Sequence, residues 1–259
     1  MPTTVVRILG GAPAKTDEFP WMAALGHLNS ELKVEFNCGG TLISNNFVLT
    51  AAHCVKHSLR LVLVRLGKQN LTDGTEAVDR TIEDIITHPD YSAMTKLNDI
   101  ALIRIKAVKF AKNVIPACLQ MDVRDMPSNE PLIVTGWGSV SAERTNKSST
   151  LLKTQLKTMP IAECSSTLLS NRTSNLSSLK NITNGQYCAF DPNAQNDSCQ
   201  GDSGGPLQTF TDDSSISTVV GIVSFGISCG TAMPAVYTRV AYYLDWIESI
   251  VWPNTEVFK

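Results

Sequence analysis

The sequence contains no long hydrophobic segment, no marked excess of either charge and no cysteine pair with zinc-site spacing. Its 259 residues carry 22 Lys plus Arg against 24 Asp plus Glu, which leaves a formal charge of −2. So small a charge creates no positive field for nucleic acid, and no uncharged apolar run approaches the roughly 18 residues that span a bilayer. We therefore expect neither a nucleic-acid partner nor insertion into a membrane.

Cysteines and glycosylation sequons indicate the compartment. The cysteines are spread widely and lack Cys-x-x-Cys spacing, and Asn-x-Ser/Thr sequons occur at Asn70, Asn146, Asn171, Asn175, Asn181 and Asn196. Disulfides and glycans both favour an extracellular, secreted glycoprotein, although the cluster from Asn171 to Asn181 could be a merely polar loop. No apolar secretion segment follows Met1, so we expect the sequence to be part of a longer chain.

Short runs rich in Val, Ile, Leu and Thr, mostly bounded by Gly, Asn, Asp or Pro, predict β-strands. The runs are Val34–Phe36, Thr41–Ile43, Phe47–Thr50, Leu59–Leu66, Ile82–Ile86, Ile100–Ile105, Leu132–Thr135, Leu151–Met159, Thr218–Ser224 and Ala235–Val240. Helical spacing is clearest from Tyr243 to Ile250, and Glu163–Leu169 predicts a shorter helix. The polar stretch Gln120–Pro131 separates two strand-rich halves. The sequence therefore predicts an all-β protein in two halves.

Three short motifs could carry chemistry. They are Thr-Ala-Ala-His-Cys at 50–54, Asn-Asp-Ile-Ala-Leu at 98–102 and Asp-Ser-Cys-Gln-Gly-Asp-Ser-Gly-Gly-Pro at 197–206. A histidine beside a cysteine, or an aspartate before an apolar run, is more often structural than catalytic. The third motif differs, because a turn so rich in glycine exposes backbone N–H groups around Ser203. A hydroxyl nucleophile beside such donors is what an acyl-transfer enzyme needs.

These motifs, in this order, resemble those of trypsin-like serine proteases of the chymotrypsin family. The resemblance runs from Arg7 to about Trp252 and includes Ile-Leu-Gly-Gly at 8–11, Gly-Trp-Gly at 136–138 and Pro-Ala-Val-Tyr-Thr-Arg-Val at 234–240. Segments 18–22, 64–67 and 244–247 are similar, more narrowly, to the protease domains of arthropod clip-domain cascade proteases of the snake-like and easter-like kind.

The resemblance implies a fold and the boundaries of its parts. The expected fold is two six-stranded antiparallel Greek-key barrels with the active site in the cleft between them, followed by a C-terminal α-helix. Residues 1–7 would be a remnant of the propeptide and 8–252 the peptidase domain. Within that domain the barrels are expected at about 24–116 and 130–240 and the helix at about 241–251, with a tail at 253–259.

The resemblance also assigns the chemistry. Ser203 is implied to be the nucleophile, His53 the general base that takes its proton, and Asp99 the carboxylate that fixes the imidazole tautomer. Gly201 and Ser203 would supply the N–H groups of an oxyanion hole. The remaining histidines are interpreted as surface or packing residues: His27, His57 and His88.

Substrate preference is expected to follow from Asp197, which the resemblance places at the floor of the pocket for the side chain before the scissile bond. A poorly solvated carboxylate there favours Arg or Lys, unless Asp197 is an ordinary loop residue. The residues implied to line the pocket or pair with substrate are Ser198, Ser224, Phe225, Gly226 and Ala235. Phe225 stands where the family usually has Trp, which reshapes an apolar subsite. Ala235 stands where trypsin-like members have Gly, which leaves the Arg-to-Lys ratio and the absolute rate open. Asn196 flanks this pocket and is predicted to be unglycosylated.

Arg7 and Ile8 resemble the activation site of the family. Cleavage after Arg7 would free the α-ammonium of Ile8 to pair with Asp202, because a buried carboxylate without a cation is unstable. The uncleaved chain is then expected to be an inactive precursor that an upstream protease activates. The alternative is that Asp202 merely caps a turn.

The family pattern implies three disulfides, Cys38–Cys54, Cys164–Cys188 and Cys199–Cys229. Cys118 is left over. In clip-domain relatives the matching cysteine tethers the protease domain to an N-terminal light chain, so we predict a free or blocked thiol in this sequence.

No cofactor and no metal are expected. Many relatives bind calcium after the segment that matches residues 64–67, but Lys68 stands where an acidic ligand would be needed, and a cation repels a divalent ion.

The leading interpretation is a secreted endopeptidase that cuts proteins after Arg or Lys in an arthropod immune or developmental cascade, with a serpin-type inhibitor among its partners. A digestive trypsin is the alternative within the same chemistry, and a non-catalytic protease-homologue adaptor is the alternative of a different class. The unpaired Cys118 and the numerous sequons argue against digestion. The complete His, Asp and Ser set argues against the adaptor.

Overall fold

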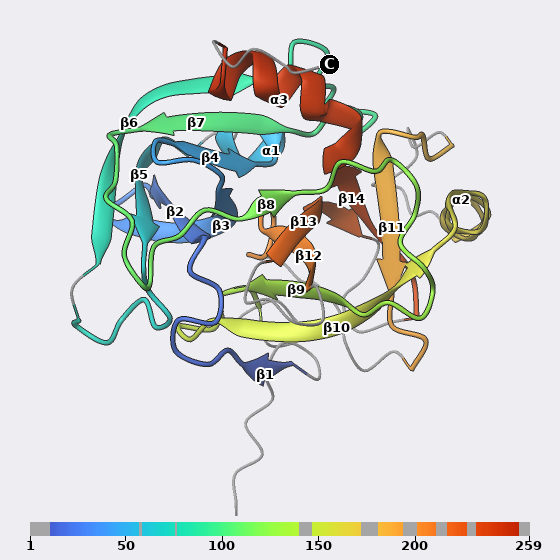
Figure 1. Cartoon of the computed structure of the whole chain (residues 1–259), viewed down its shortest axis with the longest axis horizontal. Helices are drawn as coiled ribbons and strands as arrows, with labels where there is room; N and C mark the ends of the chain where they lie inside the picture. The colour runs from blue at the N-terminus through green and yellow to red at the C-terminus, as the bar shows by residue number, and fades with distance from the viewer. Residues whose placement is uncertain are drawn as a thin grey trace, which may run out of the picture.

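The computed structural model describes residues 11–56, 59–75, 77–139, 147–171, 181–193, 201–210, 217–226 and 232–253. Six strands of the first half form a closed antiparallel barrel in the order β2-β3-β4-β7-β6-β5 (Figure 1). Their bounds are β2 Met22–Leu28, β3 Val34–Leu42, β4 Phe47–Thr50, β5 Leu61–Leu66, β6 Val78–Thr87 and β7 Ala101–Ile105.

The second half forms another barrel from β9 Leu132–Gly136, β10 Leu152–Met159, β11 Gln186–Phe190, β12 Pro206–Phe210, β13 Ser217–Gly226 and β14 Ala235–Arg239. The order is β9-β10-β11-β14-β13-β12, and the pairing of β12 with β9 closes the ring. Two short strands extend it, β1 Ala12–Pro13 on β10 and β8 Cys118–Leu119 parallel to β13. When the six strands of each barrel are numbered in chain order, their order around the barrel is 1-2-3-6-5-4 in both cases. The two barrels therefore have the same topology, although the sequence contains no visible repeat.

The helices are few and short: α1 Ala52–Val55, α2 Ile161–Ser170, the 3₁₀ helix η3 Val240–Tyr243 and α3 Leu244–Val251. α3 lies across β6 and β7 of the first barrel (Figure 1). It buries Ile247 completely, and the ring of Trp246 lies 5.3 Å from that of His88. Within the described residues no helix is both long and apolar enough to cross a lipid bilayer. The predicted all-β fold with two six-stranded barrels and a C-terminal helix is confirmed.

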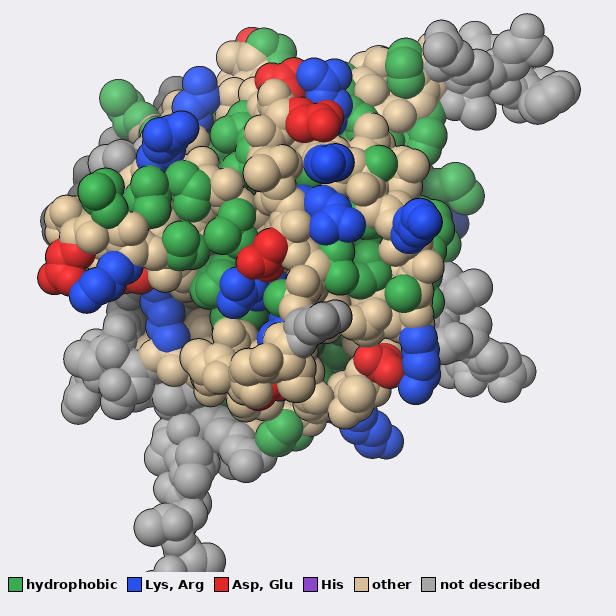
Figure 2. Space-filling view, turned by 90° about the vertical axis from the view of Figure 1, so that its left-hand side faces the viewer, with side chains coloured by type: hydrophobic (Ala, Val, Ile, Leu, Met, Phe, Trp, Pro, Cys, Tyr) green, Lys and Arg blue, Asp and Glu red, His purple; other side chains and the backbone are tan. Residues whose placement is uncertain are grey.

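The burial of the strands follows the two-sided character of a barrel wall. Val64 and Leu66 on β5 are fully buried while the residues between and beside them are only partly so, which is the period-two pattern of a strand with one face toward the core. β6 is more exposed and carries several charged side chains. Both signs of charge are interspersed on the face seen in Figure 2. No field of a single sign covers that face, in keeping with the near-zero net charge.

The structure differs from the predicted strands most clearly at β3. The runs at 34–36 and 41–43 are one continuous strand that passes through Gly39 and Gly40. These glycines permit close approach rather than a turn: a Cβ on Gly40 would lie 2.7 Å from the Val48 side chain, and one on Gly39 would lie 3.2 Å from Gly205 Cα. The prediction missed β2, β11 and β12, whose sequences mix Gly, Ala, Gln or Pro with the apolar residues.

A buried polar link joins the two barrels. Trp21, at the start of the first barrel, donates its indole N–H to Gln208 Oε1 on β12 at 2.7 Å. The same oxygen accepts the Ser217 hydroxyl at 2.9 Å, and Gln208 Nε2 donates to Thr135 Oγ1 at 3.2 Å. Gln208 is completely buried. Because water cannot replace these bonds, they fix how one barrel sits against the other.

We predict that Gln208→Leu lowers the free energy of unfolding by about 1–3 kcal/mol, because the Trp21 N–H is left buried without an acceptor. Urea unfolding followed by tryptophan fluorescence measures the change. The control is Gln155→Leu, an exposed glutamine on β10, which we expect to change stability by less than about 0.5 kcal/mol. Equal stability of the two variants would show that the link contributes nothing.

Candidate active site

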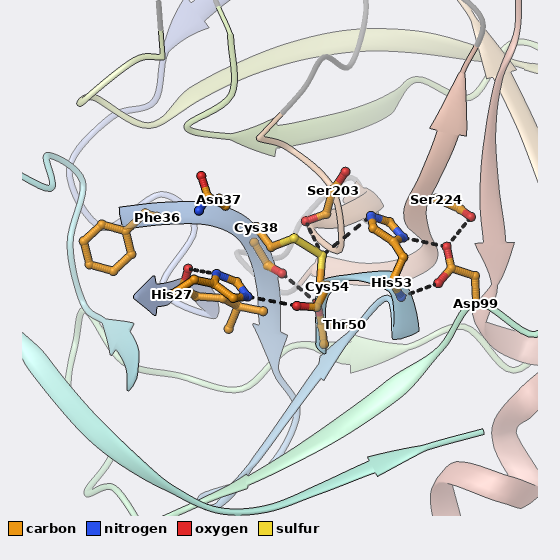
Figure 3. The surroundings of a disulfide bond; sticks show 12 residues. His27, Phe36, Asn37, Cys38, Thr50, His53, Cys54, Asp99, Ser203 and Ser224 are labelled. Atoms are coloured by element: carbon orange, nitrogen blue, oxygen red, sulfur yellow. Dashed lines mark hydrogen bonds and ion pairs between the residues drawn. A yellow bond between two sulfur atoms is a disulfide. The ribbon is translucent and has the colours of Figure 1, made fainter. Parts of the chain in front are cut away.

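Three side chains from distant segments meet where the barrels face each other (Figure 3). His53 lies on α1, Asp99 lies two residues before β7, and Ser203 lies in the turn before β12. His53 Nδ1 lies 2.8 Å from Asp99 Oδ2, and the His53 backbone N–H donates to Asp99 Oδ1 at 2.9 Å. His53 and Ser203 line the same cavity. The structure therefore brings together the three residues that the sequence singled out.

Asp99 is an ionised carboxylate inside the protein, with only 1% of its surface exposed. Burial by itself raises the pKa of Asp99, but the hydrogen bonds and the electrostatic interaction with His53, together with the hydroxyl of Ser224, hold the pKa below its usual value. Ser224 Oγ donates to Asp99 Oδ2 at 2.6 Å. A carboxylate at Nδ1 requires a proton on that nitrogen, which leaves the lone pair of Nε2 available as a base.

The backbone before Asp99 is held in an unusual conformation. Asn98 has φ +53°, in the left-handed region that asparagine tolerates better than most residues. Its side chain is fixed at both ends, because Nδ2 donates to Asp90 O at 2.8 Å and Oδ1 accepts the Tyr243 hydroxyl at 2.9 Å. Thr238 Oγ1 donates to the Asp99 carbonyl at 2.7 Å. Asn98, Tyr243 and Thr238 thus aim Asp99 at His53.

Ser203 lies with its hydroxyl beside the cleft, and its carbonyl accepts the Gly39 N–H at 2.8 Å. Among the described residues no hydrogen bond joins the hydroxyl to His53 Nε2, which instead lies 3.7 Å from Cys54 Sγ. A rotation of the Ser203 side chain toward Nε2 would complete the path for a proton. The backbone N–H groups of Gly201 and Ser203 make no hydrogen bond within the described part of the chain.

Glycine is required at two positions of this turn. Gly201 has φ +105° and Gly204 φ +77°, values that residues with a side chain rarely adopt. A Cβ on Gly201 would lie 2.8 Å from Gly138 Cα, and one on Gly204 would lie 2.2 Å from Thr50 Oγ1. The glycines therefore let the turn fold tightly between the two barrels and present Ser203 at its tip.

Asp202 points away from the cleft into a cradle made by Gly136 and Gly138. Its carboxylate is 1% exposed, and Oδ1 accepts the Gly138 N–H at 2.9 Å. A Cβ on Gly136 would come within 2.0 Å of Asp202 Oδ1, and one on Gly138 within 2.6 Å of the carboxylate. The Gly-Trp-Gly motif, which the sequence marked only by resemblance, thus has a physical reason: it makes room for a buried carboxylate next to Ser203.

The substrate-pairing candidates are partly described. Ser224, Phe225 and Gly226 end β13, and Gly226 pairs with Ala235 on β14. Ala235 is 6% exposed, and a Cβ on Gly226 would lie 3.8 Å from the Ala235 methyl group. The methyl group thus lies beside the paired glycine on the neighbouring strand. Asp197, Ser198, Arg7, Ile8 and His57 lie outside the described residues.

Two of the three expected disulfides are present, Cys38–Cys54 and Cys164–Cys188. The first braces β3 against α1 beside His53, and the second joins α2 to β11. Cys199 and Cys229 lie outside the described residues. Cys118 is an exposed free thiol on β8. Disulfides persist in oxidising compartments, which fits an extracellular location.

Comparison with known proteins identifies the family. The trypsin family profile matches residues 8–247, nearly the whole chain. The chain belongs to the trypsin family of serine proteases. It is 39% identical over 253 residues to the serine protease Hayan of Drosophila melanogaster, covering 96% of this chain and 40% of that protein.

Other trypsin-family relatives are similar over the same region. Phenoloxidase-activating factor 3 of Holotrichia diomphalia is 37% identical, covering 95% of this chain and 72% of the relative. The CLIP domain-containing serine protease B9 of Anopheles gambiae is 37% identical, covering 94% and 63%. The sequence thus spans between two fifths and three quarters of the length of these relatives. The predicted relationship to arthropod clip-domain proteases is confirmed.

Lys68 occupies the loop where many trypsin-family members bind calcium. Its side chain is 4% exposed, and its ammonium donates to Asp73 Oδ1, to Thr75 Oγ1 and, at 3.0 Å, to Thr75 O. The hydrogen bond from Lys68, with a further one from Thr75, lowers the pKa of Asp73 to about 2. These oxygens, which a hard cation would use, are already bonded to an ammonium. The absence of calcium stays a prediction.

Sequence reasoning missed the residues that support the site from outside it. Asn98, Thr238 and Tyr243 orient Asp99, and Gly136 and Gly138 accommodate Asp202. Ser224 was assigned only to substrate binding, although it also bonds Asp99. A signal was present for some of them, since Asn98, Gly136, Gly138 and Thr238 all fall within the quoted motifs. Tyr243 offered none, because its contact with Asn98 spans 145 positions.

We predict that acidification lowers the free energy of unfolding of the Asp99→Asn variant less than that of the parent protein. The folded pKa of Asp99 lies below its unfolded value, so its ionisation stabilises the fold above about pH 4, and this stabilisation is lost as the pH falls through the folded pKa. The stability difference between parent and variant should therefore be largest at neutral pH and shrink below pH 4. Urea midpoints measured from neutral pH down to about pH 2 test this. A constant difference would contradict it.

We predict that Gly138→Ala destabilises the fold by about 1–3 kcal/mol, because its methyl group overlaps the Asp202 carboxylate. Thermal unfolding measures the loss. Gly74→Ala is the control, since a Cβ there meets nothing within 4 Å and only the strain of φ +71° remains, about 1 kcal/mol. The combination of Gly138→Ala with Asp202→Ala should recover part of the loss, and failure to recover any would place the clash elsewhere.

Proposed function

We propose that this trypsin-family protein is a serine endopeptidase that cleaves peptide bonds after Arg or Lys through an acyl-enzyme. The observation that carries the proposal is the bonding of His53 Nδ1 to the buried Asp99, which leaves Nε2 facing the cavity that Ser203 also lines. Nε2 would take the Ser203 proton as Oγ attacks the scissile carbonyl, and would return it to the leaving amine as the C–N bond breaks. Water would then hydrolyse the ester by the reverse sequence of proton transfers.

The N–H groups of Gly201 and Ser203 would stabilise the oxyanion of the tetrahedral intermediate. Support comes from their lack of acceptors within the described residues and from the positive φ of Gly201, which only glycine adopts readily. Such donors contribute most where the negative charge develops, and the partial loss of an oxyanion hole lowers turnover by roughly 10²–10³.

The preference for Arg or Lys rests on Asp197, which would pair with the substrate cation at the floor of the pocket. Ser198 and the strand Ser224–Gly226 would line the pocket and pair with the substrate backbone. Ala235 would narrow the pocket by a methyl group opposite Gly226, and one misfitting methylene changes discrimination by about 1–3 kcal/mol. The ratio of Arg to Lys cleavage would then depend on how each side chain fits beside the Ala235 methyl group.

Activation would follow cleavage after Arg7 by an upstream protease, when the new α-ammonium of Ile8 pairs with Asp202. The burial of Asp202 beside Ser203 supports this, because a carboxylate in that position is stabilised by a cation. The turn from Gly201 to Ser203 would then depend on the charge that Asp202 receives. Before cleavage the oxyanion hole and pocket would be incompletely formed.

A role in an extracellular proteolytic cascade of arthropod immunity or development is proposed from the relatives, several of which are named as phenoloxidase-activating or melanization proteases. Cys118, exposed on β8, would tether the light chain of a longer protein, and a serpin-type inhibitor would be a natural regulator. A digestive trypsin and a non-catalytic adaptor are the alternatives. The adaptor is disfavoured by the Asp99–His53 bond, which a protein without catalysis does not need.

The central test is labelling of the cleaved protein by a serine-directed phosphonate that carries an arginine-like group. We expect stoichiometric labelling at Ser203, none in Ser203→Ala, and unchanged labelling in the control Ser249→Ala, an exposed serine on α3. The chain left uncleaved at Arg7 should react roughly 10² times more slowly, because its oxyanion hole is incomplete. Mass spectrometry of the adduct identifies the residue, and a cleaved protein that stays unlabelled supports the adaptor.

A further inference from the structure

A cavity of about 350 Å³ lies on the other side of Ser203 from Asp99. Figure 3 shows the arrangement: Asp99 and Ser224 lie on one side of the His53 ring, and the Cys38–Cys54 disulfide and His27 lie on the other. The cavity wall contains this disulfide, His27, Glu35 and Lys147, and it reaches Ser203 and Gly201. Because the acyl part of a substrate would extend along Ser224–Gly226, the leaving-group part would extend into this cavity.

The floor of the cavity is apolar and rigid. The disulfide connects β3 to α1, and Leu59 adds a further apolar side chain. His27 is 2% exposed, and both of its ring nitrogens face backbone carbonyls, Nδ1 that of Leu25 at 3.2 Å and Nε2 that of Cys54 at 2.9 Å. The ring therefore forms part of the wall with its polar atoms directed into the protein. Such a floor accommodates the aliphatic portion of a side chain.

Two side chains of opposite charge, Lys147 and Glu35, line the cavity, and they are not equally available to a ligand. Lys147 reaches across the cleft to the first barrel, where its ammonium donates to Phe36 O at 3.2 Å and to Asn37 Oδ1. Burial lowers the pKa of Lys147, while the nearby Glu35 carboxylate acts in the opposite direction. Two of the three N–H bonds of Lys147 are thus already committed to β3.

Glu35 is more open. It is exposed at the start of β3, and Oε1 accepts Asn29 Nδ2 at 2.7 Å, whereas Oε2 has no donor among the described residues. It is the only acidic side chain among the described residues that line this cavity. No ion pair within 4 Å joins it to Lys147 in the described structure. Glu35 therefore offers a carboxylate oxygen to an incoming ligand at the edge of an apolar floor.

We propose that this cavity receives the side chain of one of the first two residues after the scissile bond, and that Glu35 makes it prefer a basic side chain over an acidic one. The aliphatic stem of a substrate Lys or Arg would lie against the Cys38–Cys54 disulfide, with its cation at Glu35. Lys147 acts as the opposing charge, which limits the preference. This inference rests on the proposed endopeptidase function and adds the leaving-group side to the substrate class.

The test compares peptides that share Arg before the scissile bond and carry Lys, Gln or Glu at the first or the second position after it. We expect the cleaved protein to favour Lys over Glu at one of these positions by about fivefold or more in kcat/KM, the scale of one partly exposed ion pair. Glu35→Gln should reduce this ratio toward one. Lys147→Met should increase it, because the repulsive charge is removed. The control Glu31→Gln, an exposed carboxylate on the same hairpin, should leave the ratio unchanged.

An arginine amide with a small chromogenic leaving group separates this inference from the proposed function. Its leaving group is uncharged and carries no amino-acid side chain, so it offers no cation or anion to Glu35 or Lys147, and all four proteins should hydrolyse it equally. If the parent protein hydrolyses it but shows no preference for Lys over Glu, or if Glu35→Gln leaves the ratio as it was, the inference about Glu35 is wrong and the proposed function stands. If no form hydrolyses it, the proposed function itself fails.

Discussion

The structure depends above all on the buried carboxylate of Asp99, which holds the two barrels and the candidate site in register. Its oxygens bond His53 from the first barrel and Ser224 from the second, and its carbonyl accepts the hydroxyl of Thr238. A charge so deeply buried is stable only when it is fully hydrogen-bonded. The requirement to satisfy Asp99 is therefore also a requirement that both barrels be correctly placed. The orientation of the His53 ring follows from the same constraint.

A second buried carboxylate, Asp202, relates the site to the rest of the second barrel. It adjoins Ser203 in the sequence but points in the opposite direction, into the space that Gly136 and Gly138 leave. The two carboxylates thus lie on opposite sides of Ser203. Asp99 acts on it through His53, and Asp202 acts through the backbone of the turn. The burial of each carboxylate costs desolvation free energy, and buried charged groups of this kind occur chiefly at functional sites. On the far side of Ser203, the disulfide and Lys147 complete the cleft from both barrels.

The sequence predicted much of this because trypsin-family motifs are local. Residues 50–54 and 98–102 contain both the functional side chain and part of its support, so the amino-acid order was enough to name His53, Asp99 and Ser203. The strands with alternating or continuous apolar runs were also predicted, together with both longer helices. Two of the differences from the predicted strands share one cause. β3 was divided at Gly39 and Gly40, and β12 was overlooked, because propensity does not reveal that a glycine or glutamine is needed where two chain segments pack closely.

The sequence by itself determined the family and the chemical groups, which follow from short-range motifs, and an all-β protein in two halves, which follows from the runs of apolar residues. The two-barrel fold was implied by the family resemblance. Only the tertiary structure decided what surrounds those groups. The contacts of Asn98 with Tyr243, of Gly138 with Asp202 and of Lys147 with β3 join residues between 64 and 145 positions apart. No local pattern encodes such pairs, because they arise from the closure of two barrels and the packing of one against the other. The fold therefore decides which charged side chains lie on each side of Ser203, although the sequence shows every one of these residues.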